Sequence, residues 1–64
     1  MTAAPMTAQE KRECAEREVR QRRRVYPRLI EAGRMTAQKA AREIELMEAI
    51  AADYRRQEEA ARLL

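Results

Sequence analysis

The stretch that decides the fold is VYPRLIEAGRMT, residues 25–36, which separates two long helix-forming segments. Pro27 disfavours a helix that passes through it, because proline lacks a backbone N–H and restricts the residue before it. Gly33 suits the left-handed position that commonly ends a helix. The stretch therefore predicts a Pro/Gly turn with a short helical segment that begins at Pro27 and ends at Gly33. One continuous helix that is kinked at Pro27 is the alternative.

The letters MTAQ occur twice, each time where a long helix is expected to begin. Thr7 and Thr36 are suited to be N-caps, since a threonine hydroxyl can accept a hydrogen bond from a free backbone N–H of the first turn. Glu10, three residues after Thr7, would complete a capping box. We therefore expect one helix from Thr7 to about Tyr26 and a second, longer helix from Thr36 toward the end of the chain.

The composition points to helices and to association. Of the 64 residues, 39% are charged and thirteen are alanine, whereas there is one glycine and neither Phe nor Trp. Alanine, glutamate and arginine are strong helix formers. A chain of this length seldom buries enough apolar surface alone, and its single cysteine, Cys14, cannot form an internal disulfide. A second subunit would supply the missing stability.

Mostly apolar residues recur at helical spacing in both long segments, which predicts one stripe on each helix. The first stripe contains Ala8, Ala15, Val19, Arg22, Tyr26 and Leu29. The second contains Ala37, Ala40, Ile44, Met47, Ala51 and Tyr54, and it is widened by Leu46 and Ile50. Folding at the turn brings the stripes together, so we expect an all-α helical hairpin over residues 7–64. Residues 1–6 are expected to form a disordered tail.

One hairpin leaves a side of each helix uncovered, and large apolar residues are few. We expect the core and interface to consist of Ala15, Val19, Tyr26, Leu29, Ile44, Met47, Ile50 and Tyr54. Two hairpins that share this core would be more stable than one. The favoured assembly is therefore a dimeric four-helix bundle, and a different protein partner is the other way to cover the same face.

Arg22 is the charged member of the first stripe. The hairpin register that places Val19 beside Met47 brings Arg22 opposite Glu43. An arginine can lay its methylene groups along apolar neighbours and turn its guanidinium to a carboxylate. We therefore predict a structural ion pair between Arg22 and Glu43, within one hairpin or across a dimer.

The other arginines near the end of the first helix leave two interpretations open. Candidates for contact with nucleic-acid phosphates are Arg17, Arg20, Arg24 and Arg28. Phosphate contacts would make binding dependent on salt. The structural interpretation is that the helix dipole favours cations at this end and that glutamates four residues earlier pair with arginines. Those pairs would be Glu13/Arg17, Glu16/Arg20 and Glu18/Arg22.

Catalysis has few candidate groups. The chain has no histidine, no serine and a single aspartate, and one glycine is too few for a phosphate-binding loop. We expect no enzyme activity, no cofactor, no metal site and no small-molecule substrate. No apolar run approaches the roughly 20 residues that span a bilayer, and the first residues lack the pattern of a signal peptide. We expect no membrane association and a cytoplasmic location.

The segment RRRVYPRLIEAGRMTAQKAAREIELMEAI, residues 22–50, resembles a group of small helical proteins encoded in bacterial phages and prophages. The shared features are the arginine-rich helix, the Tyr-Pro step, the glycine, and Glu-Ile followed by Met and Ile at helical spacing. The resemblance implies a bacterial host cytoplasm and a non-enzymatic role in docking on a partner protein, with inhibitors of host or defence proteins as one example. It assigns no functional residue to this chain.

Overall fold

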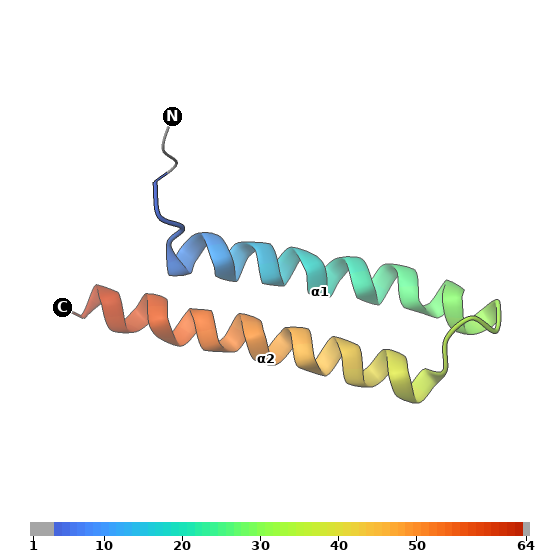
Figure 1. The fold of residues 1–64 in the computed structure, drawn as a ribbon. Helices are drawn as coiled ribbons and strands as arrows, with labels where there is room; N and C mark the ends of the chain where they lie inside the picture. Colours follow the sequence, from blue (N-terminus) through green and yellow to red (C-terminus); the bar gives the residue numbers. More distant parts are fainter. Residues whose placement is uncertain (1–3, 64) are drawn as a thin grey trace.

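The protein is an all-α helical hairpin. The computed structural model describes residues 4–63, which form two helices, α1 (Ala8–Glu31) and α2 (Ala37–Arg62). The helices run antiparallel and side by side, so the start of α1 lies next to the end of α2 (Figure 1). The described part of the chain contains no strand. The predicted fold class, a hairpin of two long helices, is confirmed.

Both helix starts have the predicted caps. The Thr7 hydroxyl accepts a hydrogen bond from the backbone N–H of Glu10 at 3.1 Å, and the Glu10 carboxylate accepts one from the backbone N–H of Thr7 at 3.3 Å. This reciprocal pair is a complete capping box. The Thr36 hydroxyl accepts from the N–H of Lys39 at 3.0 Å. Both N-caps are therefore confirmed.

The turn after α1 is closed by backbone hydrogen bonds around Gly33. Gly33 has a φ of +71°, the left-handed conformation that glycine adopts without a Cβ penalty. Its N–H donates to the carbonyl of Ile30 at 3.0 Å, and the N–H of Arg34 donates to the carbonyl of Leu29 at 2.9 Å. These two bonds form a Schellman motif, so the predicted left-handed stop at Gly33 is confirmed.

The predicted helix break at Pro27 is wrong. α1 passes through Pro27 and ends at Glu31, so there is no separate short helical segment. Pro27 is exposed, and the carbonyl that loses its hydrogen-bond donor lies on a helix surface that water reaches. Tyr26 and Leu29, on either side, are half-buried. Their partial burial favours a helix that continues through Pro27, against the roughly 3 kcal/mol that an internal proline costs.

Residues that alternate at spacings of four and three form the seam between the helices, the pattern of a coiled coil. In α1 the seam comprises Ala8, Arg12, Ala15, Val19, Arg22, Tyr26 and Leu29, and in α2 it comprises Ala40, Ile44, Met47, Ala51, Tyr54 and Glu58. The buried residues are Ala15, Ala40 and Ala51, with exposures of 4%, 3% and 8%. Small side chains let the two helices approach closely but bury little area.

Seven of the eight residues predicted for the core lie in the seam, but only one of them is buried. Ala15 is buried, and the half-buried members are Val19, Tyr26, Leu29, Ile44, Met47 and Tyr54. Ile50 is 42% exposed, because it lies beside the seam on α2 and not in it.

In the predicted disordered tail, residues 1–3 lie outside the described residues. Residues 4–6 have no helix or strand, and Met6 is 70% exposed.

Candidate functional site

The two sides of the seam differ in chemistry. One side, the apolar face, carries Met6, Cys14, Met47, Ile50 and Tyr54. We include Leu46 in this face, because it is exposed and lies four residues before Ile50, on the same side of α2. The opposite side, the charged face, is formed by Glu16, Arg20, Arg23, Glu48 and Arg55. The difference follows from the sequence, because apolar residues extend the α2 stripe in one direction only. The hairpin therefore presents two distinct surfaces to the solvent.

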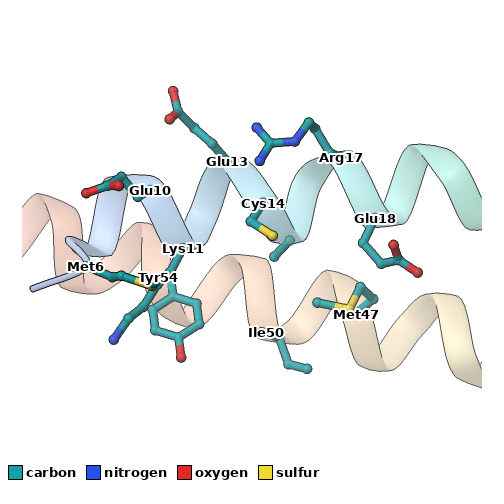
Figure 2. A pocket seen from close by; sticks show the side chains of 11 residues that line it. Met6, Glu10, Lys11, Glu13, Cys14, Arg17, Glu18, Met47, Ile50 and Tyr54 are labelled. Atoms are coloured by element: carbon teal, nitrogen blue, oxygen red, sulfur yellow. The ribbon is translucent and has the colours of Figure 1, made fainter. Parts of the chain in front are cut away.

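The apolar face contains an open groove of about 610 Å³. Cys14 from α1 and Met47 and Ile50 from α2 are among the residues that line it (Figure 2). Leu46 and Ile50 are 43% and 42% exposed, which is high for residues of this size. Within one hairpin, the largest aliphatic side chains of α2 are therefore only partly covered.

One end of the groove is held by an aromatic contact between the helices. The Lys11 ammonium lies over the ring of Tyr54, with its Nζ 5.4 Å from the ring centroid. This distance is within the range of a cation–π interaction. The half-buried Tyr54 ring lies, together with Met6 and Lys11, at the end of the groove near the start of α1 (Figure 2).

The predicted ion pair between Arg22 and Glu43 is present within one hairpin. Arg22 Nη1 lies 3.6 Å from the Glu43 carboxylate and donates a hydrogen bond to the Glu43 backbone carbonyl at 2.7 Å. Arg22 Nε also donates to Glu18 at 3.0 Å, and Lys39 pairs with Glu43 at 3.0 Å. Lys39, and to a smaller degree Arg22, lower the pKa of the Glu43 carboxyl.

A second ion-pair network, which the sequence interpretation missed, crosses the seam at the open end of the hairpin. Arg12 pairs with Glu58 and with Glu16 on its own helix, the latter at 2.8 Å. Glu16 also pairs with Arg55, and Glu58 with Arg62 at 3.4 Å. The signal was present, since Arg12 lies four residues after Ala8 and three before Ala15. Because Arg12 is charged, it does not stand out among the apolar residues that mark the seam in the sequence.

Each carboxylate of this second network is stabilised in its ionised form. The hydrogen bond from Arg12 lowers the pKa of Glu58, and in return Glu58 raises the pKa of Arg12. The hydrogen bond from Arg55, followed by the charge of Arg12, lowers the pKa of Glu16. Only 13% of the Glu58 side chain is exposed, so it is the most enclosed charged group of the network.

The predicted pairs along α1 form in only one case of three. Glu18 pairs with Arg22, as predicted. Glu16 turns to Arg12 and Arg55 instead of Arg20. Within the described residues, no ion pair is formed by the four arginines predicted as phosphate contacts, all of which are exposed: Arg17, Arg20, Arg24 and Arg28.

Other kinds of site find little support in the described residues. Between residues 4 and 63, no group of three or more His, Cys, Asp or Glu side chains is arranged to hold a metal ion. Neither α1 nor α2, as described, combines the length and apolar character of a bilayer-crossing helix.

Comparisons of the chain with protein-family models, with curated proteins and with solved structures gave no match.

Proposed function

We propose that the protein is a non-enzymatic protein-interaction module whose apolar face is covered by a second copy of the chain, giving a four-helix bundle. The observation that carries this proposal is the distribution of burial. The buried seam residues of the hairpin are alanines, whereas Leu46 and Ile50 are more than 40% exposed. Large exposed apolar groups that cluster on one face are typical of an interaction surface.

The exposed area of the hairpin supports an interface with a second copy of the chain. A compact monomer of 7.5 kDa would expose about 4,250 Å². The hairpin exposes 5395 Å², roughly 1,150 Å² more than that. A stable protein interface buries about 800 Å² on each partner. The excess surface is therefore enough for one interface of ordinary size.

The shape and the charges favour self-association. The Cα atoms extend only 13 Å along the shortest axis, so the hairpin is a single layer of helices. Domains are normally built from two layers around one core. The rim of the groove carries both signs of charge, with Lys11 and Arg17 beside Glu10 and Glu18. In a two-fold dimer each rim faces its own copy, so mixed signs allow opposite charges to meet.

Sedimentation equilibrium and thermal unfolding test the proposal. We expect a molar mass about twice 7.5 kDa and a melting temperature that rises with protein concentration. The variant Leu46→Gln/Ile50→Gln should sediment as a monomer. The control Ala49→Gln/Ala52→Gln adds the same groups at two exposed positions off the apolar face and should remain dimeric.

Two outcomes would count against self-association. A wild-type protein that stays monomeric at the highest concentration tested, with a concentration-independent melting temperature, would contradict it. Equal loss of assembly in both double variants would show that the apolar face is not the interface. A monomer would indicate that a different protein binds the apolar face. That is the docking role, as of an inhibitor, that the resemblance to phage-encoded helical proteins implies.

A further inference from the structure

The outer side of α1 carries a row of arginines that the seam does not use. The row consists of Arg17, Arg20, Arg24 and Arg28, spaced three, four and four residues apart. Such spacing places them on one side of a helix. Arg17 projects from the side of α1 that faces away from α2, at the outer rim of the apolar groove (Figure 2). Arg20, Arg24 and Arg28 do not line the groove. These three arginines therefore stay accessible when the apolar face is covered, and their availability to a partner is independent of the proposed dimer.

Intramolecular ion pairing does not explain the row. Arginines elsewhere on α1 are engaged with α2: Arg12 with Glu58, Arg22 with Glu43 and Arg23 with Glu48. In contrast, the natural partner of Arg20, Glu16, is drawn toward the seam by Arg12 and Arg55. Arg24 donates only to the neutral side chain of Gln21. The positive charge of the row is therefore left for a partner outside the hairpin.

The helix dipole explains only the last member of the row. The dipole stabilises cations within the final turn of a helix, and only Arg28 lies there. Arg20, Arg24 and Arg28 are successive like charges four residues apart, an arrangement that destabilises a helix. Glu13 and Glu31 lie at the two ends of the row, where they leave its middle uncompensated. The row therefore destabilises α1, and no ion pair within the described residues compensates for this.

We propose that this row binds the phosphate backbone of double-stranded nucleic acid without reading its sequence. From Arg17 to Arg28 the helix rises by about 16 Å, which matches the phosphates of roughly five base pairs along a duplex. No aromatic ring accompanies the arginines, because Tyr26 belongs to the seam and Tyr54 to the apolar groove. Single strands are held largely by base stacking on aromatic side chains, so the row suits a duplex better.

A membrane surface is the less suitable anionic partner. Helices that lie on membranes insert an apolar face beside their basic residues. The apolar side of α1 is its seam, which packs against α2 and is not available for insertion. The outer side of α1 presents Gln21 within the row and Glu13 and Glu31 at its two ends, all exposed and polar.

Fluorescence anisotropy with a labelled mixed-sequence DNA duplex, measured over a salt series, tests the proposal. With three to four phosphate contacts, the logarithm of the association constant should fall with the logarithm of salt concentration with a slope of about −3. The variant Arg20→Gln/Arg24→Gln should reduce that slope by about 2 and weaken binding at least ~10-fold at low salt.

The matched control is Arg34→Gln/Arg42→Gln, which removes two exposed arginines outside the row, neither of which forms an ion pair in the described residues. Both double variants lower the formal net charge from +3 to +1, because each loses two positive side chains. The control should keep the wild-type slope. Circular dichroism of both variants should show unchanged helix content, which excludes unfolding as the cause of lost binding.

Three results would overturn the proposal. Equal losses in the two double variants would mean that net charge alone attracts the duplex. Tighter binding to a single strand of the same length, or to vesicles that contain phosphatidylserine, would assign the row to another partner. Absence of duplex binding by the wild type at the lowest salt concentration would remove the site altogether.

Discussion

Arg22 crosses the seam to Glu43 and binds it twice, through the backbone carbonyl at 2.7 Å and through the carboxylate at 3.6 Å. The backbone contact is the shorter of the two, so Arg22 binds the α2 backbone at Glu43 as well as the Glu43 side chain. A guanidinium with several donors can make both contacts at once, whereas the single ammonium group of lysine is not matched to this geometry.

We predict that Arg22→Ala lowers the melting temperature more than Glu43→Ala. Loss of Arg22 removes both contacts, whereas loss of the Glu43 side chain leaves the bond to the backbone carbonyl. The double variant should be less destabilised than the sum of the two single variants, because the residues share one interaction. Strictly additive changes in unfolding free energy would show that the two side chains do not interact.

Stability should fall in acid through the cross-helix carboxylates. Arg12 lowers the pKa of Glu58 below its ordinary value of 4.5, so the ionised form is favoured in the folded state. The resulting stability is fully present above pH 4.5 and is lost as the pH falls through the lower folded-state pKa. Urea midpoints measured from pH 7 to pH 3 should decline less steeply in Glu58→Gln than in the wild type. Glu59→Gln, the control at an exposed neighbour, should keep the wild-type slope.

At Gly33 we predict a cost that comes from backbone conformation alone. No atom lies within 4 Å of a Cβ built on Gly33, so a side chain would have space there. The φ of +71° remains unfavourable for a residue with a Cβ, most of all for a β-branched one. Gly33→Val should destabilise the hairpin by about 1 kcal/mol or more, and Gly33→Asn by clearly less. Equal free energies of unfolding for the two variants would contradict a left-handed cap.

The burial of Ala40 in the seam predicts that this position does not tolerate larger side chains. Ala40 is 3% exposed, whereas its neighbour Ala41 is exposed. Ala40→Leu should push the helices apart and destabilise by about 1–3 kcal/mol, as overpacking does in cores. Ala41→Leu should change the unfolding free energy by less than about 0.5 kcal/mol. Chemical denaturation of both variants provides the comparison, and a neutral Ala40→Leu would show that the seam has room at this point.

The features predicted correctly from the sequence are those set by local chemistry. The caps at Thr7 and Gly33 depend on residues within one turn, which the sequence displays directly. The register that joins Arg22 to Glu43 follows from the length of the turn and from the heptad spacing. These signals agree with one another, which is why the hairpin could be predicted.

The features that were predicted incorrectly or missed depend on contacts between the helices. The continuation of α1 past Pro27 goes against the local preference of proline and accompanies the partial burial of Tyr26 and Leu29 in the seam. Whether Glu16 pairs with Arg20 or with Arg55 is decided by the rival partner across the hairpin. Ile50 seemed a core residue because hydrophobicity alone does not distinguish the seam from its edge.

The single tight turn has a consequence for how the hairpin opens. Near Gly33 the partner residues of α1 and α2 are close in the chain, whereas Arg12 and Glu58 are 46 positions apart. Closing the longer loop costs more chain entropy, so contacts between the helices should form first near the turn and then toward the free ends. Amide hydrogens should then exchange fastest at the free ends of both helices and slowest beside the turn. The ion-pair network around Arg12 and Glu58 lies at these free ends, where the helices separate first, and holds them together there.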